Sequence, residues 1–396
     1  MRRGTIVGSA LLVLVLSLPI VASPSARPSS IRTVTVRFRD RLGRSATVVA
    51  VMPAWYGPRR HPALPLVISP HGRGASALGN ARRWGALPGR LRFVVLSAGL
   101  RGRTLARHSW AWPTEISELA RLPRTTRRAV PYLRWDPRRV YVAGDSMGGQ
   151  ESLMLLARHP DEFAAVAAVD PVTNFLERIR QFRASLDSRG EERLAEAEVG
   201  APPTRAPWLY ERRSPAAFAR TIAFADVPAW LWWSRRDRVV VDEGGSQAGE
   251  LYTRVRALNP RAPVYERITN APHGWSFWSN HGLPAIARWL LRHHRRPAPP
   301  AGFAYASWLP RADVWGWRFR AAGVGHELWR VSDVGTNGFD SDSPVPLLVS
   351  PPFVPPAVDV DGAPVAIRDG SVLVPAGAHD VRFSAAGETS PARRTD

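Results

Sequence analysis

The sequence contains no cysteine and no lysine. The absence of cysteine excludes disulfide bonds, thiolate catalysis, and zinc or iron–sulfur sites that cysteine would ligate. The stability of the fold must therefore come from packing alone. Because lysine is absent, all 54 basic residues are arginine, and the formal net charge of the chain is +21.

The sequence also lacks motifs that would indicate a specific binding partner for this positive charge. The arginines are spread along the chain, and no nucleic-acid-binding motif accompanies them, so we expect no nucleic-acid partner. A basic surface favours at most weak association with an anionic cell envelope. The histidines are scattered and no H-E-x-x-H pattern occurs, so we expect no metal site and no cofactor.

The chain has 396 residues, of which 45% are hydrophobic, enough for a large core and for two domains. Its N-terminus has the pattern of a secretory signal peptide. Two arginines precede an apolar run from Ile6 to Val21, and small residues follow from Ala22. We therefore predict a signal peptide over residues 1–22 and a folded part outside the cytoplasm; an uncleaved membrane anchor is the alternative.

The pattern of residues 31–296 predicts an α/β domain. Two alternating stretches, Thr33–Phe38 and Ser45–Met52, indicate a β-hairpin. Short apolar runs then alternate with helical segments, which predicts a mostly parallel sheet flanked by helices. The runs are Leu64–Ser69, Arg92–Leu96, Arg139–Ala143, Ala164–Val169 and Pro228–Trp233.

Two segments depart from this pattern. Residues 174–225 are charged, helical in character and longer than a simple crossover, so we predict a cap over the carboxyl edge of the sheet. Residues 301–396 follow a proline-rich break and contain short alternating runs with Gly and Pro turns, which predict a small C-terminal β-sandwich. Four tryptophans of this module favour core packing over a ligand platform: Trp308, Trp315, Trp317 and Trp329.

The segment Gly144-Asp145-Ser146-Met147-Gly148 carries the strongest chemical pattern. It follows an apolar run and precedes a helical segment, the context of a sharp strand-to-helix turn that exposes a nucleophilic serine. The flanking glycines let such a turn pack closely against its neighbours, and the following helix N-terminus places partial positive charge near a developing oxyanion. We predict that Ser146 is a nucleophile.

An earlier segment, His71-Gly72-Arg73-Gly74, follows the first apolar run. This pattern is typical of a loop that offers a backbone N–H group to an oxyanion. We predict an oxyanion hole formed by the backbone N–H groups of Arg73 and Met147.

Acyl transfer by a serine also needs a base that an acid holds in place. We predict that His273, in an Ala-Pro-His-Gly-Trp loop, is the base, with His281 as its rival. The predicted acid is Asp237, which follows the last apolar run, with Asp170 and Asp242 as its rivals.

With these motifs in place, residues 45–295 resemble the α/β-hydrolase superfamily, in particular the catalytic domain of the prolyl-oligopeptidase type and related secreted esterases. The order serine, aspartate, histidine along the chain is the order that these enzymes use. The matching pieces are His71-Gly72, the turn at Ser146, Arg213-Ser214-Pro215, Asp237 with Val239-Val240, and His273-Gly274.

The resemblance implies an α/β-hydrolase fold with a small C-terminal all-β domain, and a serine hydrolase that acts on a small ester or peptide. Prolyl-oligopeptidase enzymes carry a β-propeller before the catalytic domain, and only a hairpin-sized segment precedes it here. This difference favours a carboxylic-ester hydrolase over a peptidase. A non-catalytic envelope-binding protein and an acyltransferase are also compatible with these motifs. The sequence determines neither the substrate groups nor the oligomeric state.

Overall fold

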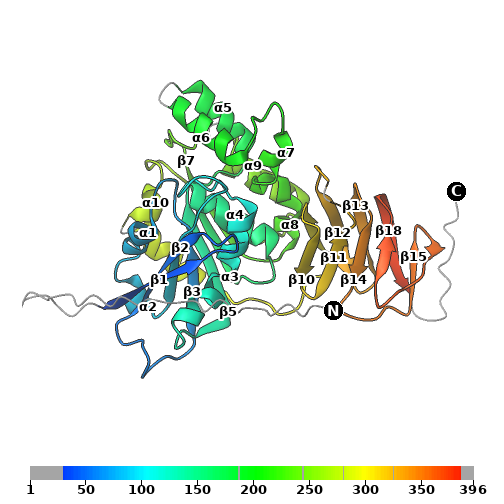
Figure 1. The fold of residues 1–396 in the computed structure, drawn as a ribbon, viewed down its shortest axis with the longest axis horizontal. Helices are drawn as coiled ribbons and strands as arrows, with labels where there is room; N and C mark the ends of the chain where they lie inside the picture. Colours follow the sequence, from blue (N-terminus) through cyan, green and yellow to red (C-terminus); the bar gives the residue numbers. More distant parts are fainter. Residues whose placement is uncertain (1–29, 186–187, 243–244, 280, 324, 385–396) are drawn as a thin grey trace, which may run out of the picture.

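The structure is a computed structural model that describes residues 30–185, 188–242, 245–279, 281–323 and 325–384. An α/β part and a purely β part lie next to each other along its longest axis (Figure 1). The predicted signal peptide, residues 1–22, lies outside the described residues. Within the described ranges, no helix is both long enough and apolar enough to cross a membrane.

A single sheet of eight strands forms the centre of the α/β part. Its strands are β1 (Ile31–Arg39), β2 (Ser45–Pro53), β3 (Leu64–Ser69), β4 (Val94–Gly99), β5 (Trp135–Asp145), β6 (Ala165–Val169), β7 (Ala229–Ser234) and β8 (Val264–Thr269). In space they follow the order β1-β2-β4-β3-β5-β6-β7-β8. The pairs β1–β2 and β2–β4 are antiparallel and all others are parallel, so the predicted hairpin and the predicted mostly parallel sheet are confirmed.

Helices cover both faces of this sheet because its strands are apolar on both sides. Along β2, Val48 and Ala50 face one side, where α3, α4, α8 and α9 pack, while Val49 and Val51 face the other side, where α1, α2 and α11 pack. These helices are α1 (Ala77–Arg83), α2 (Leu87–Leu91), α3 (Pro113–Ala129), α4 (Met147–Arg158), α8 (Ala219–Phe224), α9 (Ala248–Leu258) and α11 (Gly282–Leu290).

Helices α5 (Phe175–Ala184), α6 (Arg189–Val199) and α7 (Pro207–Glu211) stand above the carboxyl edge of the sheet (Figure 1). Their apolar cluster includes Trp110, which stacks on Phe175 with 5.1 Å between ring centroids. The same cluster contains Met147 and Val240. The helices therefore touch both the segment after Ser146 and the segment after Asp237.

The C-terminal part consists of two antiparallel sheets that enclose a second core. Trp317 and Trp329 are buried in this core, as the packing interpretation predicted. One sheet contains β10 (Arg311–Val314), β11 (Trp317–Ala321), β14 (Leu347–Ser350) and β17 (Val372–Val374). The other contains β16 (Ala363–Pro364), β15 (Ala357–Val360), β18 (Gly377–Ser384), β13 (Gly338–Ser343), β12 (Trp329–Gly335) and β9 (Phe303–Ser307).

Trp308 joins the two parts of the chain. It belongs to the same buried cluster as the core around α3, α4 and α8, and its ring lies 5.7 Å from that of Phe218. The neighbouring Tyr305 donates a hydrogen bond from its hydroxyl to the Arg158 carbonyl at 3.1 Å. The apolar core of the α/β part therefore continues into the β module.

We predict that Trp308→Ala lowers the free energy of unfolding by about 3–5 kcal/mol, because it removes a large buried ring and leaves a cavity. Chemical denaturation monitored by circular dichroism would measure this change. Leu373→Ala is the control, since Leu373 lies in the same module but is 60% exposed. Equal effects of the two substitutions would show that Trp308 is not part of a shared core.

Candidate functional site

Ser146 occupies a strained turn between β5 and α4. Its backbone angles are φ 56° and ψ −123°, in a region that non-glycine residues rarely adopt. Its N–H group donates to the Val169 carbonyl at 2.8 Å, which fixes the turn to the end of β6. Residues 141–150 are otherwise buried, and Ser146 alone among them is partly exposed.

The two glycines around Ser146 allow the backbone to approach itself. A Cβ atom on Gly144 would lie 2.4 Å from the Gly148 carbonyl oxygen, and one on Gly148 would lie 2.5 Å from the Pro70 carbonyl oxygen. No real side chain tolerates such distances to backbone atoms. The turn and the loop after β3 are therefore held against each other by backbone contact.

The two predicted oxyanion donors lie on these two segments. Met147 is the first residue of α4, and N–H groups of a first helical turn have no acceptor within their helix. Arg73 lies in the loop after β3, and its guanidinium pairs with Glu191 of α6. The assignment of the two N–H groups as an oxyanion hole stays a prediction.

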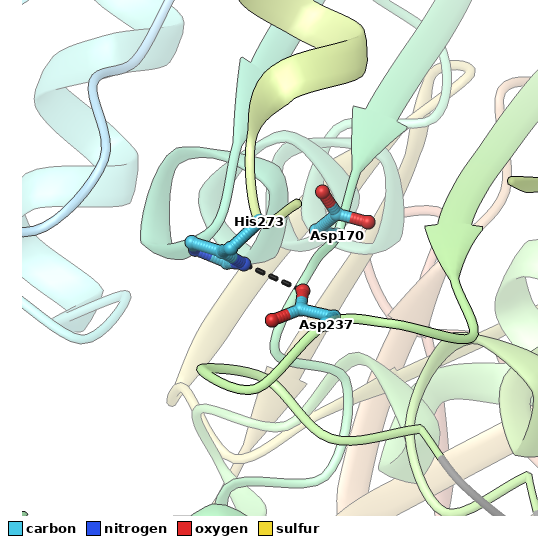
Figure 2. Close-up of side chains that lie close together, drawn as sticks. All are labelled: Asp170, Asp237 and His273. Atoms are coloured by element: carbon cyan, nitrogen blue, oxygen red, sulfur yellow. Dashed lines mark hydrogen bonds and ion pairs between the residues drawn. The ribbon is translucent and has the colours of Figure 1, made fainter. Parts of the chain in front are cut away.

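The predicted base and the predicted acid are joined by a hydrogen bond (Figure 2). Nδ1 of His273 lies 2.6 Å from Oδ2 of Asp237. The other oxygen of Asp237 accepts from the N–H groups of Val239 and Val240 at 2.7 and 2.9 Å. Since Asp237 is buried and held by the backbone, it orients the ring with Nδ1–H toward itself and leaves Nε2 free to accept a proton.

The rivals of these residues have other partners. Asp170 lies on the same side of His273 as Asp237 (Figure 2), but its Oδ2 accepts from the Gly274 N–H group at 2.7 Å. Asp242 accepts from backbone N–H groups at the start of α9. His281 is exposed at the start of α11. Among these carboxylates, Asp237 accepts the hydrogen bond from the His273 ring.

The charge around His273 favours its protonated form. Burial by itself lowers the pKa of His273, but the hydrogen bond and charge of Asp237, with the charges of Asp170 and Asp145, outweigh it and raise this pKa. Burial and the charge of Asp237 raise the pKa of Asp170 to about 7. Asp170 therefore titrates near neutral pH, and His273 titrates above its ordinary pKa.

The segment before Ser146 lies next to the loop that carries His273. Oδ2 of Asp145 accepts from Trp278 Nε1 at 2.9 Å, and a Cβ on Gly274 would lie 3.2 Å from this oxygen. No hydrogen bond joins Ser146 to His273 in the described part of the chain. Such bonds are often long in sites without substrate.

The contacts around Asp145 could not be predicted from the sequence. Arg83 Nη1 lies 3.6 Å from Asp145 Oδ1, and the guanidinium carbon of Arg83 lies 3.6 Å from the centre of the Trp278 ring. Asp145 belongs to the turn motif and could have been suspected of a structural role, but its partners lie more than sixty residues away on either side.

Asp170, Asp237 and His273 are also residue types that can bind a metal cation. One ligand atom from each of Asp170, Asp237 and His273 lies within 4.8 Å of the others. However, Nδ1 of His273 is engaged with Asp237, and Asp170 accepts from the Gly274 backbone. The three groups are arranged for hydrogen bonding within the protein, as general-base chemistry requires.

One protein-family model matches part of the chain. Residues 118–278 match the model of the Esterase family, and this segment contains Ser146, Asp237 and His273. No curated protein matches the chain.

Several solved structures are similar to this chain at low sequence identity. An acylaminoacyl peptidase from Pyrococcus horikoshii is 15% identical over 68% of this chain and 42% of its own, with a TM-score of 0.52. A puromycin hydrolase is 19% identical over 64% of this chain and 37% of its own, with a TM-score of 0.49. A ferulic acid esterase is 16% identical over 67% of this chain and 98% of its own, with a TM-score of 0.49.

The chain thus spans less than half the length of the peptidase and of the puromycin hydrolase. The predicted fold class is confirmed. The chain has the α/β-hydrolase fold, and the match of residues 118–278, which include the Ser146 turn, to the Esterase family supports a hydrolase.

Proposed function

We propose that this protein is a secreted serine hydrolase that cleaves carboxylic esters with Ser146, His273 and Asp237. The observation that carries the proposal is the 2.6 Å hydrogen bond between His273 and a buried, backbone-held Asp237, in a loop next to the strained Ser146 turn. The signal-peptide pattern of residues 1–22 supports secretion.

In the first half of the reaction, Ser146 Oγ attacks the ester carbonyl carbon while Nε2 of His273 takes the hydroxyl proton. The N–H groups of Met147 and Arg73 stabilise the negative charge that moves to the carbonyl oxygen. The intermediate then collapses, the bond to the alcohol oxygen breaks, and His273 returns its proton to the alcohol. The acyl group stays on Ser146 as an ester.

In the second half, a water molecule takes the place of the alcohol. His273 removes its proton as it attacks the acyl carbon, and the proton passes to Ser146 Oγ when the acyl bond breaks. A carboxylic acid leaves and the serine hydroxyl is restored. Asp237 stabilises the His273 imidazolium in both halves without taking its proton.

A serine peptidase is the second candidate, supported by the fold that the chain shares with the acylaminoacyl peptidase. An esterase is preferred because the family match covers Ser146, Asp237 and His273 together. A panel of short peptides and p-nitrophenyl esters separates the two candidates: turnover of peptides alone would replace our proposal by the peptidase.

We predict that Ser146→Ala lowers kcat for p-nitrophenyl esters by about 10³-fold or more, because it removes the nucleophile. The same variant should no longer react with a fluorophosphonate probe. Ser45→Ala, at an exposed strand end, is the control and should react normally. Labelling of Ser146→Ala at the wild-type rate would refute the assignment of Ser146, and a wild type that the probe does not label would support a non-catalytic protein.

We predict that kcat/KM falls as the pH drops below the pKa of His273, which lies above its ordinary value of 6.5. The base must be neutral to accept a proton, so activity is full above this pKa and lost below it. Asp170 has a pKa of about 7, so its charge also changes within the pH range of this measurement. Asp170→Asn should shift the limb to lower pH, because it removes one of the charges that raise the pKa of His273. A flat profile between about pH 5 and 8 would contradict the assignment.

We predict that Asp237→Asn lowers the pKa of His273, because burial then acts with less opposing negative charge. NMR titration of the ring in a Ser146→Ala background would measure this. The same change should lower kcat by about 10⁴-fold. The control is Asp226→Asn, at the paired but accessible Asp226, which should change neither the His273 pKa nor kcat. An unchanged His273 pKa in Asp237→Asn would mean that Asp170 is the true partner of the His273 ring.

A further inference from the structure

Asp170 follows strand β6 in a strained backbone conformation. Its φ angle is 45°, in the left-handed region that residues other than glycine rarely adopt. Its N–H group donates to the Trp232 carbonyl at 2.7 Å, and the carbonyl of the preceding Val169 accepts from the Ser146 N–H group at 2.8 Å. Such strain persists where the surrounding contacts fix the residue, and it is concentrated at functional sites. The backbone of Asp170 is therefore fixed at the strand end that holds the nucleophile turn.

The side chain of Asp170 lies beside the pair of Asp237 and His273 (Figure 2). Its Oδ2 accepts from the N–H group of Gly274, the residue that follows His273, at 2.7 Å. A hydrogen bond from a backbone N–H group to a carboxylate is among the stronger ones in proteins. Asp170 thus holds the backbone of the base loop directly next to the base.

This bond bears on the separation of the nucleophile and the base. No hydrogen bond joins Ser146 to His273 within the described residues, so other contacts must set the distance between them. Asp170 provides one such contact, because its backbone follows the strand end that holds Ser146 while its side chain holds the backbone next to His273. A displacement of about 1 Å between reacting groups can lower a rate by about 100-fold.

The charge of Asp170 is costly at this position. Asp170 is only 3% exposed, and burial together with the charge of Asp237 raises its pKa to about 7. An asparagine would accept the same N–H group without this cost. No arginine forms an ion pair with Asp170 among the residues that the structure describes, and the charge that most favours its ionised form is that of His273. The carboxylate therefore acts on the imidazolium that forms when His273 takes a proton.

We propose that Asp170 is a positioning residue of the reaction, which anchors the base loop to the strand end that holds Ser146 and adds a second negative charge beside the His273 imidazolium. This inference rests on the proposed serine-hydrolase function and adds a residue to it. Asp237 keeps its role as the hydrogen-bond partner of Nδ1. Because Asp170 acts through His273, it needs no contact with the substrate.

Two substitutions separate the anchor from the charge. Asp170→Asn keeps an oxygen for the Gly274 N–H group and loses the charge, whereas Asp170→Ala loses both. We expect Asp170→Asn to lower kcat for p-nitrophenyl esters by about tenfold, as the loss of one charge interaction allows, and to move the acidic limb of the pH profile to lower pH. We expect Asp170→Ala to lower kcat by about a further tenfold, with little change in KM, because the loop is no longer held.

Asp136→Asn and Asp136→Ala are the matched controls. Asp136 also accepts from a backbone N–H group, that of Arg138 at 2.9 Å, but it lies at the opposite end of β5 from Ser146. Neither control should change kcat or the pH profile. Circular dichroism checks that each variant is folded. If Asp170→Ala does not fold, Asp170→Gly replaces it, because glycine adopts the positive φ angle without strain and also lacks the acceptor.

A role in stability alone would lower the melting temperature of the folded Asp170 variants but leave their kcat and acidic limb as in the wild type. This result would overturn the inference. A wild-type kcat and limb in Asp170→Asn would refute the role of the charge. Equal kcat values in Asp170→Asn and Asp170→Ala would refute the role of the anchor.

Two readouts separate this inference from the proposed function. NMR titration of the His273 ring in a Ser146→Ala background should give a lower pKa with Asp170→Asn, and labelling by a fluorophosphonate should slow from wild type to Asp170→Asn to Asp170→Ala. If the wild type reacts with the probe but cleaves no ester, the proposed ester hydrolysis fails and these readouts still decide the inference. If the wild type cleaves esters and the Asp170 variants match it in both readouts, the inference alone fails.

Discussion

The backbone contact at the Ser146 turn is the constraint on which the site depends. Gly144, Gly148 and Pro70 approach so closely that no Cβ fits between them, and the Ser146 N–H group is bonded to the end of β6. This contact joins β5, the loop after β3 and β6 at one edge of the sheet. The loops after β7 and β8 carry Asp237 and His273 at this same edge, since parallel strands end on the same side of a sheet.

Much of this arrangement could be predicted because local patterns encode it. The apolar strands and the glycine turn are visible in short windows, and they led to the correct fold class. Strand β8 could not be found this way, since it lies at the sheet edge and its Glu266 and Arg267 interrupt any apolar run. Asp170 and Asp237 both follow strands, and only their geometry shows which one bonds the ring.

Contacts between distant segments were beyond the reach of sequence patterns. Arg178 is one of 54 basic residues and nothing in its neighbourhood distinguishes it. Its burial, and the absence of an ion pair between it and any described residue, depend on how α5 packs on the segment after Asp237. The same holds for Arg83, which reaches Asp145 from α1. Because the chain is so rich in arginine, its composition indicates a basic surface but does not identify the few guanidinium groups that are buried.

The packing of Trp308 has a consequence for how the protein can be divided. The proline-rich break near residue 297 suggests a convenient place to truncate the chain, and the two halves look separable in Figure 1. However, Trp308 and Leu328 of the β module belong to the core around Phe218. A fragment that ends at the break would expose this apolar surface to water. The module is therefore part of one folding unit with the α/β part, and replacing it would also require changes in the residues that it covers.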